Sequence, residues 1–416
     1  MEPVVVIGAG AAGLMAAIAA AGGPAPVLLL ERTADGGRKI LISGGGRCNV
    51  LPSTLAPQRF VTDSPPRLLR RMLRAWPLAQ MVRFFEDDVG TPLALEAESG
   101  KLFPRSNRAR DVRDGLVSLA SRRGVRLQFS TRVDGVTPAP GGWTVDTSNG
   151  RIAAGRVIVA SGGLSVPTTG SDGTGLTIAR AFGHRLHDTY PALTPLTFEP
   201  TKSDQRASHL APRTLHPEFL AGVSQRARIR ARSGERTTEA TGGFLFTHRG
   251  YSGPAILDVS HVCVRSLAAE RARVRVAWSL SPPTEWEARL RTGDRQVVTL
   301  LSQEMPERLA QALLAISDVP RDRRTSALTR AERVAVIANV TACELGWTGH
   351  EGYRKAEVTG GGVALDEVDP RTLESRHVPG LYFCGEVLDA FGPIGGHNFA
   401  WAWATGRSAG LGAAGR

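Results

Sequence analysis

The sequence predicts an α/β protein in which a parallel sheet is interrupted by a separate insert. Residues 4–31 read as an apolar strand, a glycine-rich turn, an alanine-rich helix and a second apolar strand. Short apolar strands that run into glycine or acid recur at 156–164 and 380–386. Continuous apolar strands are typical of a parallel sheet buried on both faces. The predicted domains are 1–190 (first part of the Rossmann domain), 191–343 (insert, β-rich and then helical) and 344–416 (second part of the Rossmann domain).

The composition indicates a large globular protein with a basic surface. The 416 residues are 42% hydrophobic and 22% charged, with a formal net charge of +12. This charge favours a polyanionic partner, although a basic surface without such a role is the alternative. The apolar region 14–30 is broken by glycines and prolines, and a strand begins at Val4, so we expect neither a membrane span nor a secretion signal. Four widely spaced cysteines indicate reduced thiols, a cytoplasmic protein and no metal site.

The first turn carries a dinucleotide-binding pattern. Gly8, Gly10 and Gly13 form GxGxxG between strand and helix, and Glu31 ends the next strand. In this pattern the first glycine permits the turn, the second lets backbone approach a pyrophosphate and the third allows close helix packing. The helix N-terminus attracts phosphate, and the acid accepts from ribose hydroxyls. The spacing therefore predicts an FAD or NAD site.

A second loop favours FAD over a nicotinamide cofactor. The stretch "GRKILISGGGRCNV" (37–50) follows Glu31, and its three consecutive glycines permit close approach to pyrophosphate, ribityl chain or flavin. We expect Arg38, Lys39 and Arg47 to offset phosphate charge. A nicotinamide-only enzyme does not need this second loop.

The C-terminal segment "FCGEVLDAFGPIGGHNFAWAWATG" (383–406) gives an independent indication. Glu386 suits a ribityl hydroxyl, and the helix N-terminus at 395–398 suits the electron-rich N1–C2=O edge of a reduced flavin. A buried capping acid and a turn are the alternative. The residues predicted to bind the cofactor are Gly8, Gly10, Ala11, Ala12, Gly13, Glu31, Arg32, Arg38, Lys39, Ser43, Gly44, Gly45, Arg47, Cys48, Val133, Ala160, Gly162, Gly163, Gly385, Glu386, Gly395, Gly396, Asn398 and Phe399.

Six segments resemble, in order, the motifs of the BaiN/RdsA (YhiN-like) flavoproteins. They are "GRKILISGGGRCNV", "GKLFPRSNRARDV", "RVIVASGGLSVPTTGSDGTG", "FLFTHRGYSGPAIL", "EVTGGGVALDEVDPRTLESRHVPGLYFCGEVLD" and "GGHNFAWAWATG". The resemblance implies a glutathione-reductase-like FAD-binding Rossmann domain interrupted by a β-barrel-like plus helical insert. It also implies one of two activities, formation of dihydrouridine in large-subunit ribosomal RNA or a step of bile-acid dehydroxylation. His397 stands where a tyrosine is more usual in the family.

Reduction of a uracil C5–C6 bond requires hydride from flavin N5 and a proton from an acid. Cys48 is the first candidate, because a thiol of ordinary pKa is mostly protonated at neutral pH. Arg47 beside it favours thiolate, and simple packing under the flavin is the alternative. His397 and His248 are further candidates, for which structural roles in a turn and a loop are the alternatives.

Two arginine series could contact RNA phosphates. Arg226, Arg228, Arg230 and Arg232 would share one face of a strand. Arg67, Arg70, Arg71 and Arg74 would share one face of a helix. Solvated charged faces are the alternative for both series. Trp401 and Trp403 are predicted to lie in a buried helix.

The sequence thus predicts an FAD-dependent reductase of uracil in ribosomal RNA, with rRNA or a pre-ribosomal particle as partner and no membrane. A reductase of a hydrophobic small molecule such as a steroid enone, and an FAD-containing RNA-binding assembly factor, are the alternatives. No second GxGxxG is present, so NAD(P)H would bind transiently or another protein would deliver electrons. The sequence predicts no oligomeric state.

Overall fold

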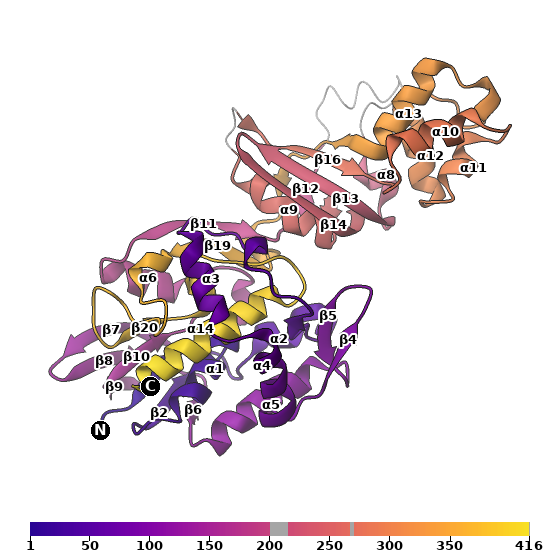
Figure 1. Cartoon of the computed structure of the whole chain (residues 1–416). Helices are drawn as coiled ribbons and strands as arrows, with labels where there is room; N and C mark the ends of the chain where they lie inside the picture. Colours follow the sequence, from indigo (N-terminus) through magenta and orange to yellow (C-terminus); the bar gives the residue numbers. More distant parts are fainter. Residues whose placement is uncertain (200–214, 267–269, 416) are drawn as a thin grey trace. The chain divides into compact units, whose positions relative to one another are not determined.

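A computed structural model describes residues 1–199, 215–266 and 270–415. The chain forms two compact units (Figure 1). Met1–Tyr190 and Val358–Arg416 make one, called here the Rossmann unit, and Pro191–Glu357 make the other, called the insert unit. None of the described helices is long and apolar enough to cross a membrane.

The insert unit ends later than the sequence predicts. Residues 344–357 were expected to belong to the second part of the Rossmann domain. Instead, β17 (Cys343–Leu345) pairs with β16 (Arg273–Ala277), and β18 (Gly349–His350) pairs with β12 (Leu196–Thr197), all within the sheet of the insert unit. Strands of two or three residues have too little pattern to be recognised in sequence, which explains the misplaced boundary.

The central sheet of the Rossmann unit has five parallel strands. Their order is β20 (Leu381–Phe383), β10 (Arg156–Val159), β1 (Val4–Ile7), β2 (Val27–Leu30) and β6 (Arg126–Gln128). Every residue of β1, β2 and β20 is buried, as expected for strands covered on both faces. Because the strands are parallel, the predicted cofactor loops that follow β1, β2, β10 and β20 all leave the same edge of the sheet.

Helices α1 (Ala11–Ala20) and α14 (His397–Ala413) pack closely beside this sheet (Figure 1). Glycines on α14 make the approach possible. A Cβ on Gly406 would lie 2.3 Å from the carbonyl oxygen of Ala12, and one on Gly410 would lie 2.2 Å from that of Ala16. The helix that starts near the predicted flavin edge is therefore fixed directly against the helix of the dinucleotide motif.

Smaller elements complete the Rossmann unit. Helices α2 (Arg38–Ile42), α3 (Pro66–Arg74), α4 (Leu78–Arg83), α5 (Ala109–Arg122) and α6 (Thr174–Ala181) lie along the chain between the strands of the central sheet. One small sheet consists of β7 (Val133–Ala139), β8 (Gly142–Thr147) and β9 (Gly150–Ala154). A second consists of β3 (Leu51–Pro52), β5 (Lys101–Pro104) and β4 (Leu93–Glu96). A third pairs β11 (Leu186–Ala192) with β19 (Val358–Val363).

The insert unit is built on a seven-stranded antiparallel sheet. Its order is β17, β16, β13 (Ser224–Ser233), β14 (Arg236–Thr247), β15 (Gly250–Ser252), β12 and β18. Its helices are α8 (Pro217–Leu220), α9 (Pro254–Val264), α10 (Pro283–Arg291), α11 (Val297–Leu301), α12 (Glu307–Ile316) and α13 (Arg330–Ala342). The order places β17 and β18 at opposite edges, and in the described chain these two strands do not pair. The sheet is thus open, and the predicted β-barrel-like shape is not confirmed.

Candidate cofactor and active site

The first turn has the geometry of a dinucleotide cradle. Gly8 has φ of 101°, and its N–H donates to the carbonyl of Leu30 at 2.8 Å. A Cβ on Gly13 would lie 1.8 Å from the carbonyl oxygen of Gly8, so only glycine fits there. A Cβ on Gly10, the N-cap of α1, would meet no atom within 4 Å. Open space in front of a helix N-terminus is what a pyrophosphate requires.

Glu31 holds its loop against this turn. One carboxylate oxygen accepts from the N–H of Ala9 at 2.8 Å. The other accepts from the N–H and hydroxyl of Thr33 at 2.8 and 2.7 Å. The side chain is thereby fixed beside the first turn, where the sequence places a ribose. Each oxygen can accept further bonds, so the structure leaves this predicted role open to a ligand hydroxyl.

The ammonium of Lys39 does not lie free for phosphate. It donates to Glu386 at 2.7 Å and to the hydroxyl of Ser165 at 2.6 Å. The second oxygen of Glu386 accepts from Ser165 at 2.5 Å and from the N–H of Thr359 at 3.0 Å. A Cβ on Gly163 would lie 2.4 Å from the Thr359 hydroxyl. This group of residues joins α2, the loop after β10, β19 and the loop after β20.

Sequence reasoning missed two members of this group. Ser165 and Thr359 are common residue types, and they stand 194 positions apart. The Thr359 hydroxyl accepts from the N–H groups of Leu164 and Ser165 at 2.7 and 3.1 Å, which fixes the turn after β10. The only available signal was the position of Ser165 two residues after the glycine pair and of Thr359 directly before a run of three glycines.

The three arginines among the predicted cofactor residues also have protein partners. The ion pairs are Arg32 with Asp172, Arg38 with Asp35 and Arg47 with Glu96. The guanidinium of Arg47 additionally lies over the ring of Phe103, 4.1 Å from its centroid. Arg38 holds the pKa of Asp35 below its usual value. The positive charge expected at the cofactor loops is therefore balanced within the protein, which is a different arrangement from the one predicted.

The triple-glycine loop leads to a buried thiol. Gly45 has φ of 68°, and a Cβ there would meet no atom within 4 Å. The hydroxyl of Ser43 donates to the carbonyl of Ile40 at 2.8 Å and so fixes the start of the loop. Cys48 is completely buried, and burial raises the pKa of its thiol to about 12. The thiol is thus neutral despite the neighbouring Arg47, and its burial supports the packing alternative.

The loop before α14 is held by its own side chains. The amide of Asn398 accepts from the N–H of Gly392 at 2.8 Å and donates to its carbonyl at 2.9 Å. Gly395 and Gly396 have φ of 115° and 89°, and a Cβ on Gly396 would lie 2.5 Å from the carbonyl carbon of Leu51. The N-terminus of α14 is therefore rigid and built for close backbone approach.

His397, the first residue of α14, is a buried neutral ring. Its side chain is only 3% exposed, and burial together with the charge of Arg59 lowers its pKa to about 4. The guanidinium of Arg59 lies 3.3 Å from Nε2 and can only donate, so Nε2 accepts and Nδ1 carries the hydrogen. Among the described residues, this buried Nδ1 has no hydrogen-bond partner.

The remaining predicted residues follow the strand ends. Gly385 is fixed by α14, since its N–H donates to the Thr405 hydroxyl and its carbonyl accepts from the Trp401 indole, both at 3.0 Å. Trp401 and Trp403 are buried, as predicted. Phe399 stacks on Trp403 with ring centroids 5.5 Å apart. Ala11 and Ala12 form the first turn of α1, Ala160, Gly162 and Gly163 follow β10, Gly44 lies in the triple-glycine loop, and Val133 begins β7.

His248 does not belong to this group of loops. It is exposed in the turn between β14 and β15, in the insert unit. Its neighbour Arg249 lies 3.7 Å from Glu351 of the same unit. The geometry of the Rossmann unit therefore brings Cys48 and His397 to the predicted cofactor loops, while His248 stays a separate prediction.

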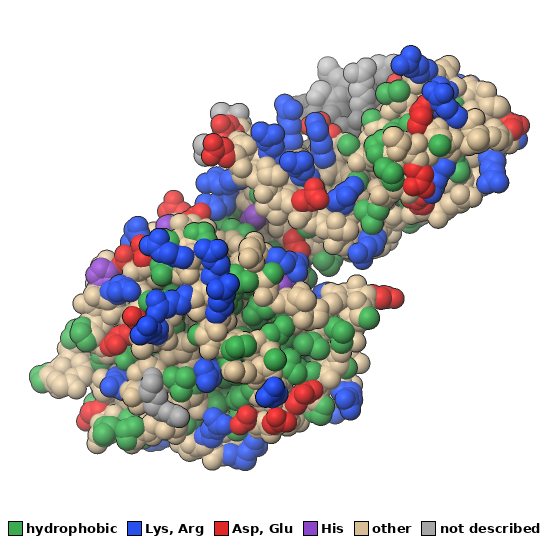
Figure 2. Space-filling view, viewed as in Figure 1, with side chains coloured by type: hydrophobic (Ala, Val, Ile, Leu, Met, Phe, Trp, Pro, Cys, Tyr) green, Lys and Arg blue, Asp and Glu red, His purple; other side chains and the backbone are tan. Residues whose placement is uncertain are grey.

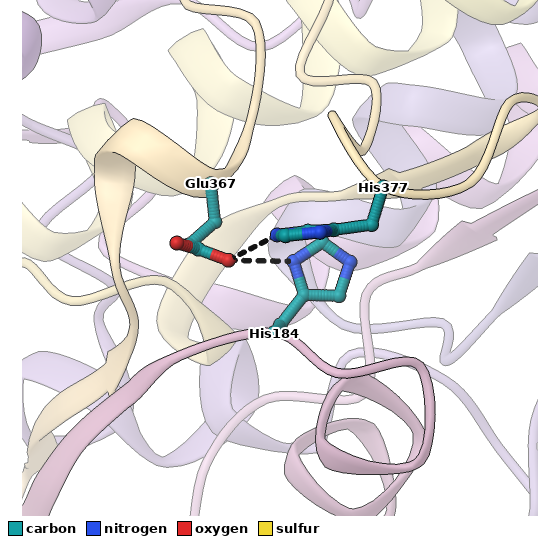
Figure 3. Close-up of side chains that lie close together, drawn as sticks. All are labelled: His184, Glu367 and His377. Carbon is teal, nitrogen blue, oxygen red and sulfur yellow. Dashed lines mark hydrogen bonds and ion pairs between the residues drawn. The ribbon is translucent and has the colours of Figure 1, made fainter.

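One histidine cluster was not predicted (Figure 3). His377 hydrogen-bonds to Glu367, and Nδ1 of the fully buried His184 lies 3.8 Å from the same carboxylate oxygen. Nε2 of His184 lies 2.9 Å from the Ser375 hydroxyl. Burial, with a smaller contribution from His377, lowers the pKa of His184 to about 4. The cluster ties the turn after α6 to the segment before β20.

Comparison with known proteins places the chain in a family. The HI0933-like protein Rossmann domain matches residues 2–412. The chain belongs to the HI0933-like family. This membership confirms the predicted family resemblance, the Rossmann-type FAD-binding fold and the assignment as an FAD-dependent oxidoreductase.

Two relatives of this HI0933-like chain are similar over nearly their whole length. It is 32% identical to the ribosomal RNA dihydrouridine synthase of Escherichia coli, covering 96% of this chain and 95% of that protein. It is also 32% identical to the 3-dehydro-bile acid delta(4,6)-reductase of Clostridium scindens, covering 100% of both. Among solved structures, the 3-ketosteroid delta1-dehydrogenase of Sterolibacterium denitrificans has the same fold, with a TM-score of 0.52 at 13% identity, covering 100% of this chain and 99% of that one.

Proposed function

We propose that this enzyme reduces uracil to dihydrouracil in large-subunit ribosomal RNA. The observation that carries the proposal is full-length similarity to the ribosomal RNA dihydrouridine synthases of Escherichia coli and, at 29% identity, Haemophilus influenzae. The net charge of +12 supports a polyanionic substrate. The cytoplasm, where ribosomal RNA is made, is the proposed location.

The loops at the sheet edge fit FAD. The open space beside Gly10 suits the pyrophosphate, and Glu31 suits the adenosine ribose. Glu386 and the backbone around Gly45 suit the ribityl chain. The unpartnered Nδ1–H of His397 suits an acceptor on the ring system, because a buried donor without a partner costs free energy that a ligand acceptor would recover. FAD supplies, when bound and reduced, a hydride that adds to C6 of uracil.

The protein must deliver one proton to C5 so that hydride and proton together saturate the C5–C6 bond. His397 offers a neutral N–H at the cofactor loops, and Cys48 offers a neutral thiol. A thiol whose pKa is raised to about 12 holds its proton strongly, and the N–H of a neutral imidazole is also a very weak acid, so acidity favours neither residue and both stay candidate donors. His248 is retained as a donor contributed by the insert unit. NAD(P)H binding transiently, or a partner protein, would supply the electrons.

A steroid-like enone is the second candidate substrate. It is favoured by the equally high identity to the bile acid reductase of Clostridium scindens. Both reactions add a hydride and a proton across a carbon–carbon double bond conjugated to a carbonyl, so the same site suits either. An FAD-containing RNA-binding assembly factor is the third candidate, and it needs no turnover at all.

The deciding experiment maps reduced uridines in ribosomal RNA by mass spectrometry, with and without the gene. We expect one dihydrouridine to disappear on deletion and to return with the wild-type gene. Gly10→Val should fail to restore it, because the added side chain enters the proposed cofactor cradle, where a Cβ meets no protein atom within 4 Å. Gly135→Val is the matched control, since its Cβ also meets no atom within 4 Å but lies in β7. Unchanged dihydrouridine after deletion would refute the RNA substrate, and reduction of an enone would then support the second candidate.

A further inference from the structure

The outer face of the insert sheet carries a ladder of arginines on two strands. Along β13, the inward residues Ala227, Ile229 and Ala231 are completely buried, while Arg226, Arg228, Arg230 and Arg232 are exposed. The inner face packs against α9. At about 3.4 Å per residue, the four arginines span roughly 20 Å. This confirms the predicted single face of the strand.

The neighbouring strand adds two arginines to this face, which sequence alone did not show. In the antiparallel register of β13 and β16, Arg230 stands directly opposite Arg275, and Arg232 stands opposite Arg273. Both β16 arginines are exposed. Residues directly opposite in such a pair share one face, and like charges there are destabilising. We call the six residues Arg226, Arg228, Arg230, Arg232, Arg273 and Arg275 the arginine ladder.

The ladder is only weakly compensated by acids. Glu239 stands opposite Arg230 and Glu344 stands opposite Arg275, giving six positive charges against two negative ones. Within the described parts of the chain, no carboxylate lies within ion-pairing distance of any ladder guanidinium. Figure 2 shows Lys and Arg side chains gathered over the insert unit. By contrast, the arginines of the predicted cofactor loops are all ion-paired.

The surroundings of the ladder favour the phosphates of a nucleic acid. The other β13 arginines face Gly243, Thr241 and Thr237 across the strand pair, which are small or polar. A membrane-binding face would place large apolar or aromatic side chains among its basic ones. The aromatic residues Phe244, Phe246 and Tyr251 of the sheet are buried instead, so among the described residues these strands offer no exposed ring for stacking bases. Guanidinium groups without base contacts position a backbone and do not read sequence.

We propose that the arginine ladder is an RNA docking surface that binds the phosphate backbone without sequence preference. The inference rests on the proposed function, because an RNA substrate makes an RNA surface necessary. The ladder retains like-charge pairs that weaken the free protein, and bound phosphates neutralise them. A rigid row about 20 Å long contacts several phosphates of one strand or groove edge.

The test measures RNA binding by the full chain with its FAD. Fluorescence anisotropy of a labelled large-subunit rRNA fragment, and of an unrelated RNA of equal length, is recorded over a series of KCl concentrations. The ladder variant carries Arg226→Gln, Arg228→Gln, Arg230→Gln and Arg275→Gln. The control variant carries Arg83→Gln, Arg110→Gln, Arg126→Gln and Arg330→Gln, which removes the same charge from scattered positions outside the ladder.

We expect the ladder variant to bind both RNAs at least about tenfold more weakly than the control near 0.1 M salt. The slope of log K against log salt should fall by about 0.7 to 0.9 for each phosphate that the variant no longer neutralises. The melting temperature should stay equal or rise, because the variant removes the opposed pair Arg230 and Arg275. A structural role for the ladder would lower it.

Several results would overturn the inference. Equal RNA affinity of the ladder and control variants would refute the ladder, even if gene deletion abolishes dihydrouridine and so supports the proposed function. Absence of RNA binding by the wild type, or binding only to anionic lipid vesicles, would also refute it. Conversely, weaker RNA binding by the ladder variant with unchanged rRNA dihydrouridine after deletion would support the ladder and refute uracil reduction.

Discussion

Lowering the pH should destabilise the protein through His397, beginning at a higher pH than that at which ordinary carboxylates titrate. The ring has its ordinary pKa of 6.5 in the unfolded chain and a pKa of about 4 in the folded protein. Because the folded pKa is depressed, the stabilising contribution of the neutral ring is complete above pH 6.5 and is lost as the pH falls toward 4. Between pH 6.5 and pH 5, a span of about 1.5 pH units, the free energy of unfolding therefore falls by about 2 kcal/mol.

Urea unfolding of wild type and His397→Gln at pH 7.5, 6.5 and 5.0 measures this contribution. Glutamine can still accept from Arg59 but does not titrate, so the variant should lose about 2 kcal/mol less than wild type between pH 7.5 and 5.0. NMR titration of the ring in the wild type gives the pKa directly. Arg59→Gln should raise that pKa while leaving it depressed, because burial is the larger cause.

Two results would refute this reasoning. One is a ring that titrates near pH 6.5 in the folded protein. The other is a His397→Gln variant that loses as much stability on acidification as the wild type. Either would mean that water reaches the N-terminus of α14, and the predicted hydrogen bond from Nδ1 to a bound ligand would lose its basis.

Three further substitutions probe the packing around the site. Gly406→Ala places a Cβ 2.3 Å from the carbonyl oxygen of Ala12 and so forces α1 and α14 apart. Thermal unfolding should show a free energy of unfolding lower by about 1–3 kcal/mol, and the purified variant should contain less FAD. Lys39→Met leaves Glu386 without a cation and should cost about 1–3 kcal/mol, part of which Glu386→Gln restores in a double-mutant cycle. Cys48→Ala should cost about 1 kcal/mol and keep dihydrouridine formation; lost turnover with full FAD content would establish the thiol as the acid.

The strands and the cofactor edge could be predicted because their signals are local. Four apolar residues followed by glycine or acid define a strand and its end within a few positions, as at Val4–Ile7 and Val27–Leu30. Parallel strands then bring their ends to one edge, whatever the sequence between them. The alternation of arginine and apolar residues in β13 likewise fixes which side chains face outward.

Contacts between distant segments could not be predicted in this way. Thr359 reaches Ser165 across 194 positions, and neither residue type is distinctive. The arginines of β16 were visible as an alternating segment, but only the register places Arg275 opposite Arg230. A positive side chain also gives no indication of its own partner. Lys39 therefore suggested a phosphate, while the structure pairs it with Glu386.

The ion pairs of the two units differ, and this difference predicts two kinds of anion-binding site. In the Rossmann unit, the cations of the predicted cofactor loops are balanced by carboxylates such as Glu96 and Glu386. The proposed cradle at Gly10 would therefore attract pyrophosphate through backbone N–H groups and the dipole of α1. Such a site is short-ranged and recognises a shape. In the insert unit, the arginine ladder keeps its charge, which acts over a Debye length of about 10 Å and fixes no single pose. A small cofactor that must stay bound needs the first kind of site, whereas a large RNA that must arrive and leave needs the second.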